Sequence, residues 1–382
     1  MSELKVDTVL NLAGTGKPNF QNGITVNGAA TSTLNLNQYT ASSSEPSNPD
    51  NGALWWDTAN EKTFIYAEGE WKETIGVASG IVNGGDRAVH HAGRRTDQVY
   101  SQLDYWSIPT TGNAADFGDL LVSQRSYQNG GISNKTRGIY SIAYNTKDLN
   151  YITFATTGSA TDYGDLTSKI YNFAGGSNGT IGLMNLTRYR DSGDNLIFDP
   201  SIIDKITIAT AGNATDFGYT MSVAVILPCG LSDGTTFIKA GGTSQNSVST
   251  GVNTIEKITF DTSANASDFG DLTQTRSEFS GTANATYGVL AGGINSSLSI
   301  VNIIEYITVA SPSNATDFGD LTGSRRDQAS CCNQARMTIS GGGGIGNNII
   351  EYVTIDTPSN ATDFGDLLGD SINCNVSSGN AS

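Results

Sequence analysis

The stretch Thr316-Asp317-Phe318-Gly319-Asp320-Leu321 is one of six similar copies of a motif that recurs through most of the chain. In each copy an aspartate precedes an aromatic residue, and a glycine follows it. The spacing of 46 to 54 residues between copies predicts a protein built from six similar structural units. The aspartate and aromatic positions are Asp116 and Phe117, Asp162 and Tyr163, Asp216 and Phe217, Asp268 and Phe269, Asp317 and Phe318, and Asp363 and Phe364.

A second motif precedes each copy at a fixed distance. In the fifth repeat it reads Ile304-Glu305-Tyr306-Ile307-Thr308-Val309, and its second residue lies 12 residues before Asp317, as it does in every repeat. Its β-branched and aromatic residues indicate a strand. The constant spacing predicts a rigid pair of strands, because a shift of one residue would turn every side chain to the opposite face. The remainder of each repeat varies in length, as surface loops do.

The variable part of the repeat also contains a strand, which ends in two glycines at Gly292 and Gly293 in the fifth repeat. About four strands in roughly 50 residues match one blade of a β-propeller. Over roughly residues 76–382 the repeat resembles the kelch family, which implies that fold. The resemblance rests on an opening arginine, the Gly-Gly strand end, and an acidic residue in the third strand, as at Glu256, Glu305 and Glu351. The chain departs from that family where Phe or Tyr replaces the usual Trp.

The two ends of the repeat region predict how it closes. The first Gly-Gly, at Gly84, has no full opening strand before it, and the last motif is followed by enough chain for one more strand. We therefore expect an all-β fold: a six-bladed kelch-like β-propeller over residues 76–382, closed by the C-terminal strand and preceded by a small β-rich N-terminal attachment region. Closure leaves no exposed sheet edge that invites aggregation. An open solenoid of six repeats is the alternative.

The N-terminal part shows no such repeat. Lys5–Leu10 and Gly23–Gly28 are short strand-like segments among Gly-rich turns, and residues 52–74 predict a small β-meander with three of the four Trp. A module of this size rarely buries enough surface to be stable alone, so we expect oligomerisation. The expected organisation is an attachment segment at 1–40, a Ser/Pro-rich linker plus the meander at 41–75, and the propeller at 76–382.

The meander resembles the small β-modules of phage tail fibres, in which a strand like Trp55-Trp56-Asp57-Thr58 is followed by an aromatic strand and an end that contains a Trp, here Trp71. Leu4–Thr8 and Asn22–Val26 resemble the N-termini of structural proteins of marine cyanophages. These resemblances imply a virion appendage made in the host cytoplasm. They imply attachment to other tail or baseplate proteins through the N-terminus, a homotrimer, and a propeller that binds a host-surface receptor, which we expect to be a glycan.

Two other functions remain open at this point. One is a purely structural virion component, such as a collar, baseplate or head-decoration protein. The other is a depolymerase that acts on envelope polysaccharide. Enzymatic chemistry finds little support in the residues, because the carboxylates repeat equivalently and none is unique in the way that a glycosidase pair would be. No nucleophile elbow is present. We therefore expect a protein that is not an enzyme and has no catalytic residues.

Composition argues against several further classes of ligand. The net charge is −16, and Lys and Arg do not cluster, which disfavours nucleic acid. No run approaches 18 apolar residues, so no membrane insertion is expected. The first residues lack the basic start and apolar core of a signal peptide, which predicts a cytoplasmic site of synthesis. The four cysteines show no CxxC spacing, so neither disulfides nor a zinc site is expected. They are Cys229, Cys331, Cys332 and Cys374.

Metal and cofactor sites are not expected either. The Asp-x-x-Asp pairs lack the dense acidic loop that calcium prefers, and turns capped by these side chains are the favoured explanation. His90 and His91 are the only histidines, and adjacent residues of a strand point to opposite faces. We expect Arg125, Arg276 and Arg325 to form structural ion pairs with the acidic residues of the third strands.

The best candidate for a recognition surface is the insertion of the third repeat, from Gly176 to Pro200. Arginine and aromatic residues on a loop are common in binding patches. A solvated hairpin tip is the simpler interpretation of the same residues. The candidate recognition residues are Arg188, Tyr189, Arg190, Asp191 and Asp194.

Overall fold

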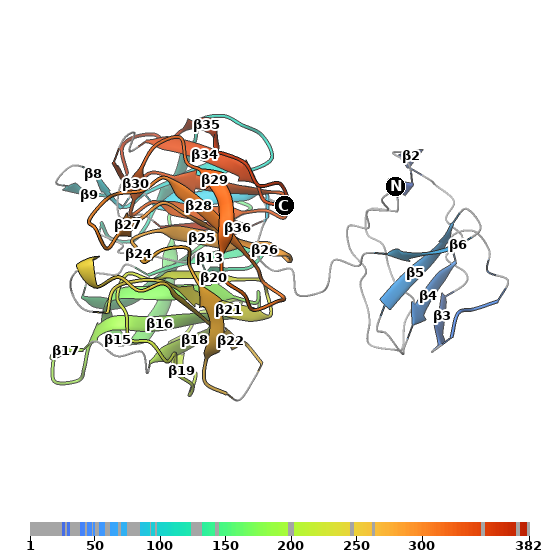
Figure 1. Ribbon diagram of the computed structural model, residues 1–382, viewed down its shortest axis with the longest axis horizontal. Coiled ribbons are helices and arrows are strands. Elements are labelled where there is room, and N and C mark those ends of the chain that lie inside the picture. The colour runs from blue at the N-terminus through green and yellow to red at the C-terminus, as the bar shows by residue number, and fades with distance from the viewer. Residues whose placement is uncertain are drawn as a thin grey trace. The chain divides into compact units, whose positions relative to one another are not determined.

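The computed structural model divides the chain into two compact units, residues 1–79 and 80–382 (Figure 1). In the first unit the structure describes residues 25–26, 29–30, 39–42, 44–47, 49, 53–57, 62–67 and 70–74. In the second it describes residues 85–91, 93–95, 98–123, 132–141, 145–197, 202–244, 248–261, 264–344, 348–371 and 375–379. Strands dominate both units and most sheets are antiparallel, which confirms the all-β class.

The fourth, fifth and sixth repeats each form a four-stranded antiparallel sheet with the same strand order. Glu305 lies opposite Asp317, so the two sequence motifs are the third and fourth strands and pair as predicted. The fourth repeat contains β20 (Cys229–Ser232), β21 (Thr236–Ala240), β22 (Thr254–Thr259) and β23 (Ser267–Asp271). The fifth contains β25 (Ser280–Ala283), β26 (Tyr287–Ala291), β28 (Ile303–Thr308) and β29 (Thr316–Asp320). The sixth contains β31 (Ala329–Cys332), β32 (Arg336–Ser340), β34 (Ile349–Thr354) and β35 (Thr362–Asp366).

The second and third repeats merge into one eight-stranded sheet because they share strand β15 (Thr161–Ser177). Its first part pairs with β14 as the outer strand of the second repeat, and its last part pairs with β16 as the inner strand of the third. The remaining strands of this sheet are β12 (Ile132–Ser133), β13 (Arg137–Ser141), β14 (Thr146–Thr153), β16 (Ile181–Arg190), β17 (Leu196–Ile197), β18 (Ile203–Thr207) and β19 (Thr215–Asp216).

The first repeat takes its inner strand from the C-terminal end of the chain. Strand β36 (Asn375–Gly379) pairs antiparallel with β7 (Arg87–His91), with Val376 opposite His90. The sheet continues through β10 (Gln102–Ser107) to β11 (Ala115–Asp119). The predicted pairing of a C-terminal strand with the first repeat is therefore confirmed.

The sixth repeat contacts the first in the same way that neighbouring repeats contact each other. Between the fifth and sixth repeats, Ala361 donates its backbone N–H to the carbonyl of Asp320 at 2.8 Å. Between the sixth and the first, Ala114 donates to the carbonyl of Asp366 at the same distance. The inner strands also contact one another in succession, from β12 through β15, β20, β25 and β31 to β36, and β36 contacts β12.

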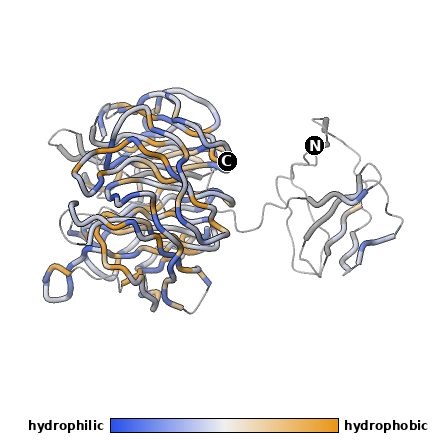
Figure 2. The backbone as a smooth tube through the Cα atoms, viewed as in Figure 1, coloured by the Kyte–Doolittle hydropathy of each residue, from blue (hydrophilic) through white to orange (hydrophobic). Residues whose placement is uncertain are grey.

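The hydrophobic core lies between neighbouring sheets. One cluster joins Phe318 of the fifth repeat to Val353 of the sixth, and another joins Phe364 of the sixth to Trp106 of the first. Figure 2 shows hydrophobic and hydrophilic stretches following one another along the strands of the second unit. Phe217 is only half-buried, because β19 ends at the preceding residue.

In five of the six copies the motif glycine is required by the close approach of the next repeat, and the exception is Gly218. Gly319 has φ 149°, a backbone region that residues with a side chain rarely adopt. A Cβ at this position would also collide with the backbone of Ser359, in the connection that precedes β35. The motif aspartates are exposed in all six copies, and the Asn360 side chain accepts the backbone N–H of Asp320 at 3.0 Å. The capping group between these repeats is therefore an asparagine of the next repeat.

Irregular structure gathers at one end of the sheets. Because the strands are antiparallel, the connections between the second and third strands of a repeat emerge at the same end as the connections between repeats. We call this end the variable face, and its short elements lie along the left edge of the second unit in Figure 1. These elements are β8 (Arg94–Arg95), β9 (Gln98–Val99), β24 (Arg276–Ser277), β27 (Ile294–Asn295), β30 (Arg325–Arg326), β33 (Gly343–Gly344) and the 3-10 turn Val248–Thr250.

In the four-stranded sheet of the first unit, one additional strand joins the predicted meander. Strands β4 (Leu54–Asp57), β5 (Lys62–Ala67) and β6 (Glu70–Thr74) are antiparallel, and β3 (Tyr39–Ser42) joins parallel to β4. The indole of Trp55 donates to the carbonyl of Ser42 at 3.1 Å, and that of Trp71 to the carbonyl of Pro46 at 3.4 Å. Part of the expected linker is therefore bound to the meander. A two-residue hairpin, β1 (Thr25–Val26) with β2 (Ala29–Ala30), falls at the second predicted strand, and Lys5–Leu10 lies outside the described residues.

Candidate recognition site

The candidate recognition residues lie at the end of the long hairpin β15–β16, on the variable face. Arg188, Tyr189 and Arg190 belong to strand β16, and Asp191 and Asp194 lie in the turn that leads to β17. The insertion that the sequence suggested as a loop is therefore strand as far as Arg190. The reason is the pairing of β16 with the second half of β15, which extends the sheet well beyond the length of the other repeats.

A β-bulge positions the side chains of this hairpin. The register of β15 against β16 shifts between Ile170 and Asn172, which places a bulge at Tyr171. Bulges commonly redirect a side chain in this way. Tyr189, opposite Ile170, packs in the core, and so does not take part in a surface site. The bulge thus makes Tyr171, which the sequence did not single out, the centre of the arrangement.

Two arginines surround the Tyr171 ring. The guanidinium carbon of Arg188 lies 4.9 Å from the ring centroid, and that of Arg190 lies 5.6 Å from it. Arg190 Nε also donates a hydrogen bond of 2.9 Å to the Tyr171 hydroxyl. Cation–π attraction of this kind stabilises a cation by about 0.5–1 kcal/mol at exposed sites. The tyrosine therefore fixes the orientation of Arg190 while leaving it at the surface.

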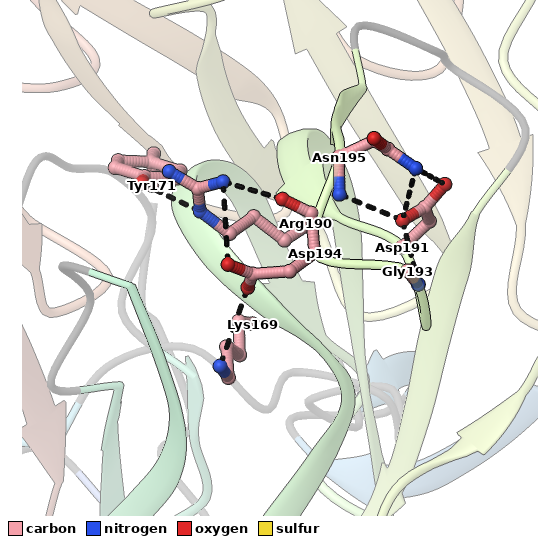
Figure 3. A network of polar contacts seen from close by, with 7 residues as sticks. All are labelled: Lys169, Tyr171, Arg190, Asp191, Gly193, Asp194 and Asn195. Carbon is pink, nitrogen blue, oxygen red and sulfur yellow. Dashed lines mark hydrogen bonds and ion pairs between the residues drawn. The ribbon is translucent and has the colours of Figure 1, made fainter.

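The carboxylate of Asp194 lies between two cations (Figure 3). It is 3.4 Å from Lys169 Nζ and 3.7 Å from Arg190 Nη1, and Arg190 also donates to the Asp194 carbonyl at 2.5 Å. The side chains of Asp194, Lys169 and Arg190 are 66%, 48% and 27% exposed. Ion pairs with this exposure contribute little to stability, at most about 1 kcal/mol.

The turn itself is held by Asp191. Its carboxylate accepts the backbone N–H of Gly193 at 2.9 Å and that of Asn195 at 2.8 Å, and it also contacts the Asn195 side chain (Figure 3). The hydrogen bonds from Asn195, with that from Gly193, lower the pKa of Asp191. The Asp191 side chain therefore stabilises the turn. The Asp194 side chain does not have this structural role.

The acidic residues of the third strands form structural ion pairs with buried cations. Arg276 pairs with Glu305, and Arg325 with Glu351 at 3.1 Å, as predicted. Glu256 differs from the prediction because its partner is Lys239, at 3.1 Å. Arg125 lies outside the described residues.

The same acidic position also joins each repeat to the one before it, a link that was not predicted from the sequence. A backbone N–H just beyond the motif of one repeat donates to the third-strand side chain of the next, as Thr273 does to Glu305 at 2.9 Å. The position is filled by an asparagine in the second repeat and by carboxylates in the others. The other donor and acceptor pairs are Leu121 and Asn150, Thr167 and Asp204, Ser222 and Glu256, Thr322 and Glu351, and Leu368 and Asp104.

Both histidines are buried in the first repeat. His90 lies between the hydroxyls of Ser340 and Ser371, at 3.0 and 2.9 Å. His91 Nε2 lies 3.0 Å from the carbonyl of Tyr100, and burial lowers its pKa from 6.5 to about 4. Within the part of the chain that the structure describes, no three His, Cys, Asp or Glu side chains gather as metal ligands.

Three cysteines are buried thiols of the second unit. Cys229, Cys331 and Cys332 are all free and buried, and Cys374 lies outside the described residues. Burial raises the pKa of Cys332 to about 11, so this thiol is not activated as a nucleophile at neutral pH.

Large apolar side chains are exposed on the variable face. Those with the greatest exposure in the described part of the chain occupy connections at this end of the sheets, and they are Leu121, Val122, Leu196, Leu298 and Leu368. Single exposed apolar residues need no explanation, but their shared location distinguishes this face from the opposite end of the sheets. The sequence signal for it, a second apolar residue after the Asp-x-x-Asp-Leu motif, is present at Leu121 and Leu368.

In the described residues the longest helical segment is the three-residue turn Val248–Thr250, and none of them forms a helix able to cross a membrane. Comparisons with known proteins add no family to these observations: no protein-family model matches the chain, and no curated protein matches it.

Proposed function

We propose that the second unit is a closed six-bladed β-propeller and that the chain is a non-enzymatic virion appendage protein, resembling phage tail fibres, which uses this propeller to bind a glycan on the host surface. The observation that carries the closed ring is the contact between the sixth and first repeats. Leu368 donates to Asp104 at 3.1 Å, in the position where Thr322 donates to Glu351 at 2.8 Å between the fifth and sixth.

The distribution of constant and variable structure supports a binding role. Strand pairing and the hydrogen bonds between repeats recur around the second unit, whereas the connections at the variable face differ from repeat to repeat. A rigid scaffold that carries variable loops is the usual arrangement of binding proteins. A propeller alone does not determine function, so the virion assignment rests on the resemblance of the N-terminal segments.

The proposal that the chain is not an enzyme rests on the use of its carboxylates. Asp104, Asp204, Glu256, Glu305 and Glu351 are buried, and each accepts a hydrogen bond from the preceding repeat. Carboxylates engaged in this way are held for structure and are not available for proton transfer to a substrate.

The first unit supplies the proposed attachment region. We place the contacts to other virion proteins in residues 1–40 and trimer formation in the meander module. The module's sheet is small, with β3 and β6 at its two edges. A sheet of this size gains stability from association, which favours an oligomer.

A purely structural role in the virion is the second candidate, and the exposed apolar residues of the variable face favour it. Leu121, Val122 and Leu368 are 53%, 42% and 49% exposed, and such side chains suit a contact with another protein. In that case the same face would contact a neighbouring virion protein.

Adsorption experiments separate these functions. An antibody against residues 80–382 should label intact particles of the virus that encodes the chain, and its Fab fragment should block their adsorption to host cells. Normal adsorption with the propeller masked would contradict host binding and favour the structural role. Incubation of the purified chain with host polysaccharide tests the third function, because release of reducing ends would identify a depolymerase.

A further inference from the structure

We propose that Lys169, Arg188 and Arg190 form a contact site for an anionic saccharide, one that carries carboxylate or sulfate groups, and that the Asp194 carboxylate occupies the place of the ligand's anionic group in the unliganded protein. The inference rests on the proposed binding function and names the ligand class of its recognition site. It goes beyond that function because it assigns to Lys169, Arg190 and Asp194 parts that can be tested separately.

The charge of the site is opposite to that of the chain. The net charge of the protein is −16. Yet Lys169, Arg188 and Arg190 lie together at the end of the β15–β16 ladder that is farthest from the turn between the two strands. Arg190 lies opposite Lys169 in the ladder, and Arg188 shares the Tyr171 ring with Arg190. A local cationic site on an acidic protein favours an anionic ligand and disfavours long polyanions such as nucleic acid, which need many such contacts.

The geometry of Arg190 suits a carboxylate or a sulfate. Its guanidinium is held by the hydrogen bond from Nε to the Tyr171 hydroxyl at 2.9 Å, while Nη1 points toward Asp194 (Figure 3). A planar guanidinium in a fixed orientation binds such anions through charge-assisted hydrogen bonds. Leu196 lies opposite Arg190 on β17 and is 36% exposed, which places an apolar surface beside the cations for the C–H face of a sugar ring.

The Asp194 carboxylate can leave the cations without opening the turn. Asp191 holds the turn through its hydrogen bonds from Gly193 and Asn195. Asp194 takes part in the turn through its backbone, because its N–H lies 3.0 Å from the Asp191 carbonyl and its own carbonyl accepts from Arg190 at 2.5 Å. Asp194 has φ 62°, a conformation that asparagine also tolerates well. Asp194→Asn therefore removes the charge and keeps the backbone.

Binding of the full-length chain to immobilised polysaccharides tests the site. Dextran sulfate supplies sulfate groups, polygalacturonate supplies carboxylates, and uncharged dextran is the reference, so the arms identify which anion is bound. We expect binding to at least one anionic polymer and none to dextran. Lys169→Gln and Arg190→Gln should each weaken binding at least about tenfold, because each removes a charge-assisted contact. Asp194→Asn should strengthen binding severalfold, because it removes the internal competitor.

The control variant is Lys135→Gln, which removes an exposed lysine in the turn between β12 and β13, at the opposite end of the sheets. It should bind as the unchanged protein does, and all variants should melt within a few degrees of it. Weaker binding of Asp194→Asn, equal losses in Lys135→Gln and Lys169→Gln, or no binding to either anionic polymer would overturn the proposal. If Lys169→Gln and Arg190→Gln still bind host cells normally, the recognition site is elsewhere and the binding function stands.

Discussion

The backbone N–H of Leu368 donates a hydrogen bond of 3.1 Å to the carboxylate of Asp104, across 264 residues of sequence. Asp104 is buried and also accepts from the side chain of Gln102 at 2.8 Å. Hydrogen bonds of the same kind join the other repeats in sequence order, so this one differs only in linking the last repeat to the first. It is the contact that most directly distinguishes a ring from a linear stack.

Replacement of Asp104 by alanine should destabilise the second unit. The substitution removes the hydrogen bonds that the buried Asp104 carboxylate accepts from Leu368 and Gln102, at a cost of about 1–3 kcal/mol. Chemical denaturation of the full-length chain, followed by circular dichroism, would measure it. Asp116→Ala removes an exposed aspartate of the same repeat and is the matched control, with an expected change below about 0.5 kcal/mol. If both variants have the same free energy of unfolding, the hydrogen bond from Leu368 to Asp104 does not stabilise the second unit.

Removal of residues 372–382 should be more damaging than any single substitution, because it deletes β36 and exposes the edge of β7. An unpaired edge lined by buried residues invites association between molecules. We expect a lower melting temperature and, in size-exclusion chromatography, larger assemblies than the intact protein forms. Removal of residues 380–382, which follow β36, is the control and should change neither. A chain without β36 that melts like the intact protein and remains monodisperse would instead support a linear stack.

The pairing of the two repeated motifs could be predicted from the sequence, because it depends on local spacing. The constant distance from Glu305 to Asp317 fixes the register of β28 against β29, and the observed bulge between Ile304 and Glu305 recurs in the equivalent strands. The strand that completes the first repeat could also be predicted, since a missing inner strand at one end of the chain matched an extra strand at the other.

Other features depend on contacts between distant residues and had no local signal. The bulge at Tyr171 arises from the pairing of β15 with β16, and the sequence gives no reason to choose that tyrosine. The partner of Glu256 is Lys239, which occupies the adjacent strand where other repeats use an arginine from the connection before the repeat. Phe217 matches the motif in sequence, but the strand ends before it because Gly218 turns back to the Asp216 side chain at 3.0 Å.

His91 should make the second unit less stable in mildly acidic solution. Burial lowers its pKa in the folded protein to about 4, below the ordinary value of 6.5 that applies in the unfolded chain. Between these two values the unfolded chain binds the proton and the folded protein does not, so the free energy of unfolding falls as the pH drops from about 6.5 to 4, by up to about 3 kcal/mol. Denaturation curves at a series of pH values would measure the slope.

The variant His91→Gln removes this titration and should flatten the dependence of stability on pH in that window. Its stability at pH 7 should be lower, because the glutamine fills the buried site less well. If the free energy of unfolding of His91→Gln depends on pH between 4 and 6.5 as that of the unchanged protein does, carboxylates and not His91 cause the acid sensitivity.

The buried pair of Arg276 and Glu305 should show strong coupling, because both side chains are fully buried. Glu305→Gln leaves the guanidinium without its counter-charge and weakens the acceptor of Thr273, so we expect a loss of about 3–5 kcal/mol. Arg276→Met alone leaves an unpaired carboxylate and should cost a similar amount. The double variant, Arg276→Met with Glu305→Gln, should be considerably more stable than the sum of the single effects predicts, since neither buried charge remains. Additive losses in this double-mutant cycle would mean that the two side chains act independently.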